Sequence, residues 1–209
     1  MRRLRIALAV VLAAPCAATV LLFPLRDAHA EVFHDGQVLA PGAFALGFEG
    51  ESQFEPGTNN LVFAHLGVGL PQNIDLGLKV SFFDRAIYFG ADVQYGLLDD
   101  GEGYPALSVK GGGHWYDYPE KTRQADFFGF DGAAVMSEDI RNVTGFVAYD
   151  VDVDFPPGYG RPLYRQHVVV GVRINVSEHL SFFVEGGYGL KNRTDPTRHY
   201  VSGGPTLFF

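Results

Sequence analysis

The chain has very little cysteine: among its 209 residues there is one, Cys16, in the N-terminal stretch. An intrachain disulfide is therefore excluded, and the fold must rest on backbone hydrogen bonds and packing. Basic residues are few as well, with 16 Lys and Arg against 24 Asp and Glu and a formal net charge of −8. Because nucleic acid is itself strongly negative, we expect no nucleic-acid partner.

Helical periodicity is the second absence. From residue 43 to the end, no stretch repeats apolar residues at helical spacing, whereas apolar and polar residues alternate one by one between turn-like clusters. The sequence therefore predicts an all-β chain that forms one domain. The expected strands are 43–54, 61–70, 74–83, 87–98, 106–118, 126–136, 143–155, 164–176, 180–190 and 200–209.

The first thirty residues differ from the rest of the chain. They combine a cationic start, "MRRLR", an almost unbroken apolar run over 6–25 and the small residues Ala28 and Ala30. This pattern predicts a secretory signal peptide over 1–30, followed by one domain over 31–209. Its removal takes four basic residues and one acidic residue and leaves a net charge of −11. The apolar run is long for a signal peptide, so an uncleaved anchor helix is the alternative.

Each expected strand has one apolar face and one face of small, polar or charged residues. A soluble β-sandwich shows the same alternation, with its apolar face packed inside. Three features favour a membrane instead: strands of about ten residues, which suit a tilted crossing of a bilayer, aromatic residues near the strand ends, and the export signal. A sheet in lipid must close on itself to satisfy its backbone groups. The sequence therefore predicts a closed antiparallel transmembrane β-barrel.

Ten strands are favoured over eight. The eight-stranded alternative makes 119–163 a single external loop, which is unusually long for a segment without secondary structure. Within it, however, 143–155 alternates cleanly, with Val147, Tyr149 and Val151 on one face. Both counts are even, so both place the two termini at the periplasmic end.

The last 36 residues resemble a known group of proteins. "INVSEHLSFFVEGGYGL" from Ile174, then a loop and a final strand ending on Phe209, is similar to the last hairpin of small outer-membrane β-barrels of the opacity and OmpA-like kind. This resemblance implies an outer-membrane location, a surrounding of outer-membrane lipid, and recognition of the last strand by the barrel-assembly machinery through Phe209 and Leu207. Pro205 departs from the pattern because it removes a backbone donor, so a bulge or a missing bond is expected there.

No metal or cofactor site is expected. "DVDVD" places Asp150, Asp152 and Asp154 at the spacing that begins an EF-hand loop, but Phe155 and Arg161 stand where that loop needs Gly and Glu. In a strand these carboxylates are also too far apart to share one ion, so solvated acids facing the lumen or a loop are the preferred interpretation. Three histidines fall on predicted inward faces, where hydrogen-bonded lumen residues are the default: His65, His114 and His167.

An enzyme is not expected either. His179 and Ser181 have the spacing of the His-x-Ser pair of lipid A deacylase barrels, and Glu185 follows on the same face. Six residues of extended strand separate His179 from Glu185 by about 20 Å, which is too far for a hydrogen-bonded triad.

Charged residues on the predicted inward faces carry the functional hypothesis. We expect a charge network in the lumen formed by Glu49, Lys79, Asp92, Lys110, Arg173 and Glu185. Charges in a narrow barrel must be paired or hydrated, so a plugged lumen is favoured over an open path. The predicted function is a structural, surface-interaction or narrow-pore role. The alternatives are a lipid-modifying outer-membrane hydrolase and a soluble periplasmic barrel that binds a lipophile.

The signal-peptide hypothesis gives the first testable prediction. We expect the mature protein to begin at Glu31, because Ala28 and Ala30 form the small-residue cleavage pattern and a polar stretch follows. The intact mass of protein extracted from membranes measures this directly. A mass that includes residues 1–30 would favour the anchor helix instead.

Overall fold

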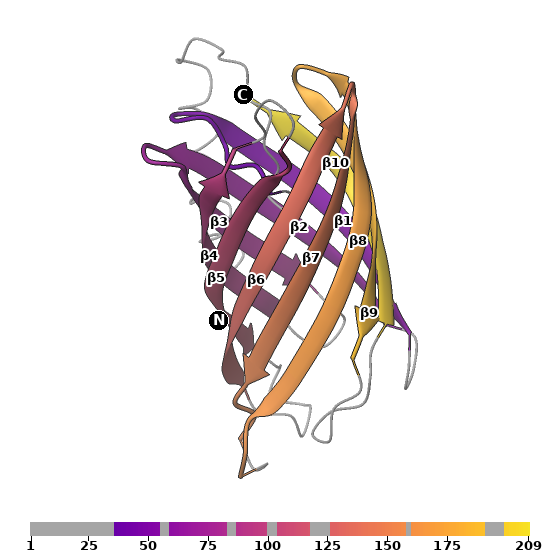
Figure 1. Ribbon diagram of the computed structural model, residues 1–209. Coiled ribbons are helices and arrows are strands. Elements are labelled where there is room, and N and C mark those ends of the chain that lie inside the picture. The colour runs from indigo at the N-terminus through magenta and orange to yellow at the C-terminus, as the bar shows by residue number, and fades with distance from the viewer. Residues whose placement is uncertain are drawn as a thin grey trace, which may run out of the picture.

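The protein is a closed barrel of ten antiparallel strands (Figure 1). The computed structural model describes residues 36–54, 59–82, 87–99, 104–117, 126–157, 160–190 and 199–209. The strands are β1 (Phe44–Phe54), β2 (Asn59–Leu70), β3 (Ile74–Phe82), β4 (Ile87–Leu98), β5 (Ala106–Asp117), β6 (Phe127–Ile140), β7 (Val143–Asp154), β8 (Leu163–Ser177), β9 (Leu180–Gly189) and β10 (His199–Phe208). The ten-stranded prediction is confirmed, and the eight-stranded alternative is wrong.

Every strand pairs with its neighbours in the sequence, and β1 pairs with β10 to close the ring. No helix long and apolar enough to cross a membrane occurs in the part of the chain that the structure describes. Strands rather than helices form because alternation with period two places one face of each segment inside the barrel and the other outside.

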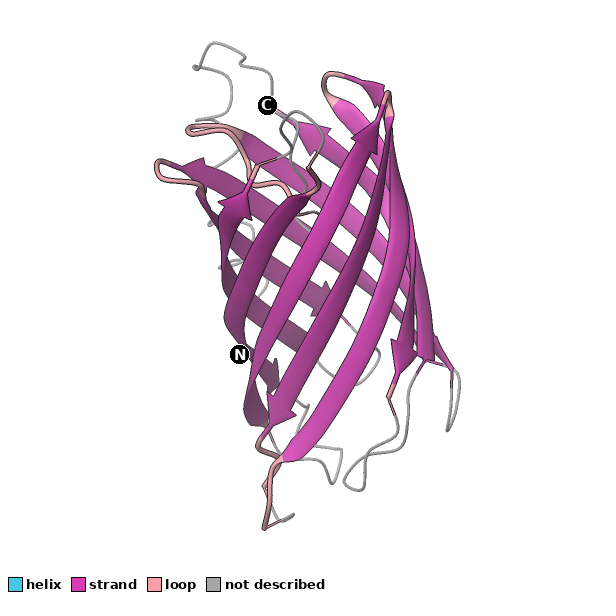
Figure 2. Cartoon of the chain, in the orientation of Figure 1, coloured by secondary structure: helices cyan, strands magenta, loops and turns pink. Residues whose placement is uncertain are grey.

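Short connections gather at one end of the barrel, here called the turn end; the opposite end is the loop end (Figure 2). Gln72 and Asn73 between β2 and β3 and Arg141 between β6 and β7 have positive φ angles of 68°, 56° and 64°. Such angles reverse the chain within a few residues. The C-terminus lies at the turn end (Figure 1).

The expected end of the sixth strand is wrong by four residues, whereas the other expected boundaries agree with the structure within two residues. The sequence suggested that 137–142 is a turn, but β6 continues to Ile140 and the turn is confined to Arg141 and Asn142. The polar residues Ser137 and Asp139 resembled a turn because they are hydrophilic. They are instead inward-facing strand residues at the mouth of the lumen, and both bind the N-terminal segment described below.

Pro205 interrupts the seam between β1 and β10 as expected. The pairing runs from Ala45↔Phe208 to Gly47↔Thr206 and resumes in the same register at Gly50↔Gly203. Between these positions the pairs that would involve Pro205 and Gly204 are missing, because proline has no N–H to donate. No bulge forms, since the register is the same on both sides of the gap.

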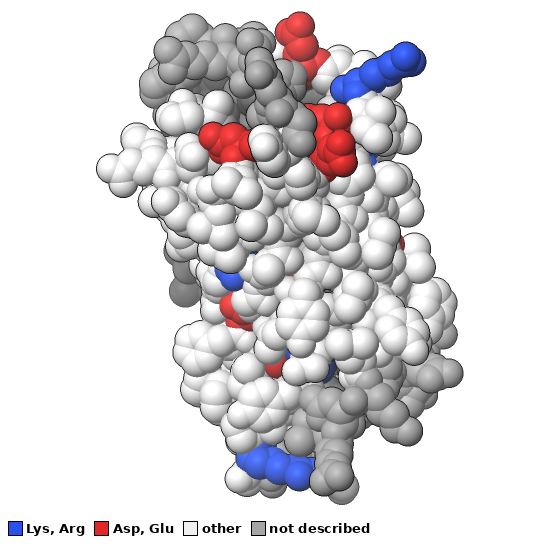
Figure 3. Space-filling view, viewed as in Figure 1, with Lys and Arg blue, Asp and Glu red and all other residues white. Residues whose placement is uncertain are grey.

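On the face shown in Figure 3 the outer wall is mostly uncharged; the larger charged patches lie toward its two ends, and small ones show between uncharged side chains at mid-height. Large apolar side chains such as Leu78, Val170 and Phe182 point outward along the middle of the strands and are exposed. Outward aromatic residues lie nearer the strand ends, among them Phe54, Trp115, Phe128, Phe155 and Tyr188 at the loop end and Tyr95, Tyr104 and Phe209 at the turn end. This is the distribution of a wall with an apolar band between two aromatic girdles.

The outer wall predicts that the cost of introducing a charge depends on its depth in the bilayer. Val170 in the middle of β8 and Val176 near its turn end are equally exposed on the same face, at 60% and 61%. In lipid vesicles, Val170→Arg should lower the free energy of unfolding by about 2–4 kcal/mol, whereas Val176→Arg should cost about 0–1 kcal/mol, because the cost of a charge falls toward the bilayer surface. Denaturant titration measures both. Equal costs would contradict a bilayer centred on the middle of β8.

Candidate functional site

The lumen is the candidate site because polar and charged side chains line it from ten strands. Large inward side chains lie over glycines of the neighbouring strand: a Cβ at Gly187 would come within 1.9 Å of the Tyr200 ring, and one at Gly129 within 2.2 Å of the His114 ring. These contacts place the rings directly against the wall. At these two places a large inward residue therefore packs over a glycine of the adjacent strand.

The first of three polar groups, the Glu49 cluster, joins Glu49 of β1, His65 of β2 and Lys79 of β3. Glu49 Oε2 lies 2.9 Å from His65 Nε2 and 3.4 Å from Lys79 Nζ. Lys79 also lies over the Phe63 ring, 4.2 Å from its centroid. Glu49 and His65 are almost fully buried, so this carboxylate is held by partners in place of water.

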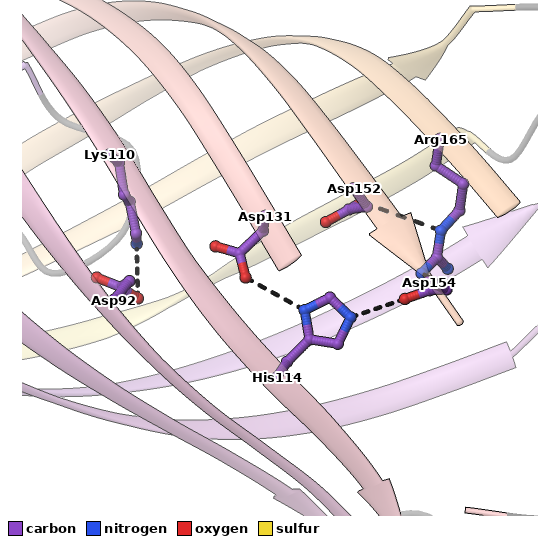
Figure 4. A network of polar contacts seen from close by, with 7 residues as sticks. All are labelled: Asp92, Lys110, His114, Asp131, Asp152, Asp154 and Arg165. Atoms are coloured by element: carbon purple, nitrogen blue, oxygen red, sulfur yellow. Dashed lines mark hydrogen bonds and ion pairs between the residues drawn. The ribbon is translucent and has the colours of Figure 1, made fainter. Parts of the chain in front are cut away.

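The second group, the His114 cluster, occupies the loop-end half of the lumen (Figure 4). His114 of β5 lies between two carboxylates, with Nδ1 3.2 Å from Asp131 Oδ1 of β6 and Nε2 2.7 Å from Asp154 Oδ1 of β7. Arg165 of β8 pairs with Asp154 and lies 4.0 Å from Asp152. An ionised carboxylate only accepts hydrogen bonds, so each ring nitrogen that carries a proton donates to the aspartate beside it. The cluster thus links four consecutive strands.

Lys110 and Asp92 form a separate ion pair beside the His114 cluster, with Lys110 Nζ 3.2 Å from Asp92 Oδ2 (Figure 4). This pair joins β4 and β5, and both side chains are about one-seventh exposed. Asp92 also lies over Gly77 of β3, where an added Cβ would meet its carboxylate at 2.4 Å. The pair therefore ties together three strands at mid-height.

The third group, the Arg173 cluster, lies toward the turn end. Arg173 of β8 is fully buried, and its Nη2 donates to Thr144 Oγ1 of β7 at 2.8 Å. Asp139 of β6 accepts a hydrogen bond from Thr144 and lies 3.9 Å from the same guanidinium nitrogen. This arrangement provides a charged partner and a hydrogen-bonding partner for a buried arginine.

The structure brings together some of the expected network and extends it. Lys79 lies with Glu49, and Lys110 with Asp92. Arg173 contacts Thr144 and Asp139, neither of which was expected in the network. Glu185 accepts a hydrogen bond from Ser202 Oγ at 3.1 Å. The network is therefore a set of local clusters, each between adjacent strands.

Asp150, Asp152 and Asp154 all face inward, and Asp154 is not a solvated acid: it is 3% exposed and bridges His114 and Arg165. Their alternation in one strand was visible in the sequence, and the phase of β7 could have identified them as inward-facing residues.

The charges on the inner wall are unequal in number. The described inward residues comprise ten acids, Glu49, Glu51, Asp75, Asp92, Asp131, Asp139, Asp150, Asp152, Asp154 and Glu185, against four bases, Lys79, Lys110, Arg165 and Arg173. Acids therefore outnumber bases among the described inward residues, and the lumen is acidic.

A further segment of the lumen had no signal in the sequence. Residues 36–42, here called the strap, cross the turn end inside the barrel and lead into β1. Gly36 N donates to Ser137 Oγ at 3.1 Å, Gln37 donates to Asp139, and Leu39 N donates to Asp75 Oδ2 at 3.2 Å. A segment without periodicity gives no indication of the wall it will contact.

The other candidate residues do not assemble into a reaction centre. His179 is exposed at the turn between β8 and β9, whereas Ser181 is buried and Glu185 contacts Ser202 further along β9. Within the described ranges, no group of three or more His, Cys, Asp or Glu residues could hold a metal ion. His65 and His114 are both hydrogen-bonded to carboxylates.

Comparison with known proteins supports the architecture. No protein-family model matches the sequence, and no curated protein matches it either. A bacterial polysaccharide outer membrane secretin has a similar structure, with a TM-score of 0.51 and 11% identity; the match covers 79% of this chain and 64% of that one. An outer membrane channel from Pseudomonas putida F1 is similar with a TM-score of 0.54 and 11% identity, over 87% of this chain and all of the other. At this identity the likeness shows a shared fold alone.

The filling of the lumen is testable at two adjacent glycines of β5. A Cβ at Gly112 would come within 2.6 Å of the Ala91 carbonyl oxygen and 2.8 Å of Asp92 Cβ, whereas one at Gly111, on the outer face, would meet nothing within 4 Å. Gly112→Ala should lower the free energy of unfolding by about 1–3 kcal/mol through overpacking. Gly111→Ala should be neutral or slightly stabilising. Denaturant unfolding of the two variants compares them, and a neutral Gly112→Ala would contradict a tightly filled lumen.

Proposed function

We propose that the protein is an integral outer-membrane β-barrel with a closed or nearly closed lumen, which serves as a structural or surface-interaction protein. The observation that carries this proposal is the distribution of polarity. The outer wall presents exposed apolar residues on every strand, while the buried interior holds carboxylates, guanidinium groups and imidazoles. A barrel in lipid requires this arrangement, because the surroundings are apolar and the inside is not.

The same observation argues against a soluble barrel that binds a lipophile. Such a protein needs an apolar interior to hold its ligand and a polar wall toward water. Here, buried Glu49, Arg173 and Asp154 line the interior, and Val170 and Phe182 are exposed outside. A lipophile would have to displace paired charges, which is costly.

The proposed outer-membrane location rests on the C-terminal strand, β10, which closes the barrel. Leu207 and Phe209 point outward at the turn end, and their neighbour Phe208 is buried inside. The resemblance to opacity and OmpA-like barrels implies that this alternating, aromatic C-terminal strand is recognised by the barrel-assembly machinery. A member of that superfamily would carry short turns toward the periplasm and its longer connections outside.

We also propose that the protein is not an enzyme. The nearest resemblance to a catalytic set, at His179, Ser181 and Glu185, spreads along one strand from an exposed turn to the middle of the lumen. A nucleophile and its base must lie within hydrogen-bond reach of each other. Incubation of the purified barrel with lipopolysaccharide and phospholipid vesicles should release no fatty acid. Release that depends on Ser181 would support the hydrolase alternative.

The closed lumen is testable by planar-bilayer recording. The refolded protein should show little or no steady conductance, because the Glu49, His114 and Arg173 clusters fill the lumen at successive heights. Lys79→Ala should produce openings, since it removes the cation beside Glu49 and leaves carboxylates to be hydrated by water. The openings should favour cations, because acids exceed bases on the inner wall.

Lys79→Arg is the matched control: it retains the positive charge beside Glu49 and should stay closed. A large and stable conductance of the unmodified protein would reject the closed lumen and favour a porin. Openings of equal frequency in Lys79→Arg and Lys79→Ala would show that the charge pair is not what closes the path.

A further inference from the structure

We propose that the strap, residues 36–42, is a gate that closes the turn-end mouth of the lumen and whose displacement admits small cations. This inference rests on the proposed function, since a gate has meaning only in a barrel with a path through it. It concerns a segment outside the ten strands and a different part of the lumen from the Glu49 and His114 clusters.

The strap spans the full width of the mouth. It begins at β6, where Gly36 and Gln37 bind Ser137 and Asp139, and it ends at the start of β1. In the closed order of strands, β6 lies opposite β1, five strands away in either direction. Between these two points the strap is also contacted by Gln94 of β4, whose Nε2 donates to the Gln37 carbonyl at 3.1 Å. The backbone thus runs along the inner wall from β6 past β4, β3 and β2 to β1, and the Leu39 side chain reaches Phe183 of β9 and Phe208 of β10.

One apolar side chain fixes the middle of the strap. Leu39 is 1% exposed and packs with Ala43, Ala45, Phe183 and Phe208, on the inner face of the seam that closes the barrel. Its amide donates to the carboxylate of Asp75 on β3. Leu39 thus fills the turn-end opening with an apolar plug, in a lumen whose other contents are mostly polar.

The strap can leave without disrupting the barrel. Its attachments from Gly36 to Leu39 are a few hydrogen bonds and one apolar contact, and none belongs to the ladder between strands. Backbone pairing with β2 begins at Gly42, whose N–H donates to the Gly69 carbonyl at 2.9 Å. Gly42 has a φ of +83°, a conformation that suits glycine and bends the chain at the wall. A segment held by few contacts beside a rigid ring is one that opens first.

The inner wall indicates what a displaced strap would admit. Asp75 and Asp139 hold the strap by its amide and side-chain N–H groups, and Arg173 is the one described base in this part of the lumen. When the strap leaves, these carboxylates lose donors and face the opening. Together with the excess of acids further inside, they favour small cations over anions.

One experiment measures access from the turn end without requiring conduction. Ser108 of β5 is fully buried and accepts a hydrogen bond from Gln94, the residue that binds the strap. In a Cys16→Ser background, Ser108→Cys should react slowly with cationic 2-aminoethyl methanethiosulfonate. Adding Gly69→Val should speed the reaction by about tenfold or more. The reason is that a Cβ at Gly69 would lie 2.1 Å from the Ala40 carbonyl oxygen and 2.7 Å from that of Leu39, so the strap backbone must move.

Gly145→Val is the matched control, because a Cβ at this glycine near the turn end of β7 would meet nothing within 4 Å. It should leave the labelling rate unchanged. Equal rates with and without Gly69→Val would overturn the gate, as would equal acceleration by Gly69→Val and Gly145→Val.

A second experiment locks the strap in place. A Cβ at Gly96 would lie 3.3 Å from Val38 Cγ2, which suits a disulfide between cysteines at these two positions. In the Lys79→Ala background, Val38→Cys with Gly96→Cys should abolish the openings when oxidised and restore them when reduced. Openings that persist after the disulfide has formed would overturn the gate. If Lys79→Ala itself shows no openings, the proposed charge plug is wrong, and the labelling experiment still decides the strap.

Discussion

The pairing of β1 with β10 is the interaction on which the rest of the structure depends. It closes the ladder, so that no strand presents a free edge, and a sheet without edges is the one kind that lipid tolerates. Closure also fixes the two environments, since each strand then has one face in the lumen and one outside. The gap at Pro205 costs little because the same register resumes beyond it, and Phe208 and Leu39 pack against the inner side of this seam.

Closure creates a narrow interior, and two features of the sequence suit it: paired charged residues and glycines. Bulky inward residues such as Tyr200 and His114 lie over glycines on the adjacent strand, which gives them room without widening the barrel. Charged residues are distributed as local clusters between neighbouring strands, so that each buried ion has a partner within reach. The contacts that hold neighbouring strands together are thus the same ones that would close the proposed path.

The excess of acids in the lumen is related to the strap, because the strap donates hydrogen bonds to two of these acids. Asp75 and Asp139 at the turn end each accept a hydrogen bond from residues 36–42, and Asp139 is also contacted by Thr144 and Arg173 of the wall. The strap therefore adds hydrogen-bond donors to these acids without adding positive charge. Removing it would both open the mouth and expose a negative surface, which joins the proposed gate to the proposed ion preference.

The sequence by itself determined the class of fold, favoured ten strands over eight and gave the inward or outward direction of most strand residues, because period-two alternation is a local property that any one strand displays. It also placed Glu49, Lys79, Asp92, Lys110, Arg173 and Glu185 on the inner face. Only the tertiary structure decided which charges meet, because register and tilt set the height of each residue, as the pairing of Arg173 with Asp139 shows. The position of the strap also depended on the tertiary structure. Residues 36–42 show no periodicity, and their contacts with β6 exist only once the barrel has closed.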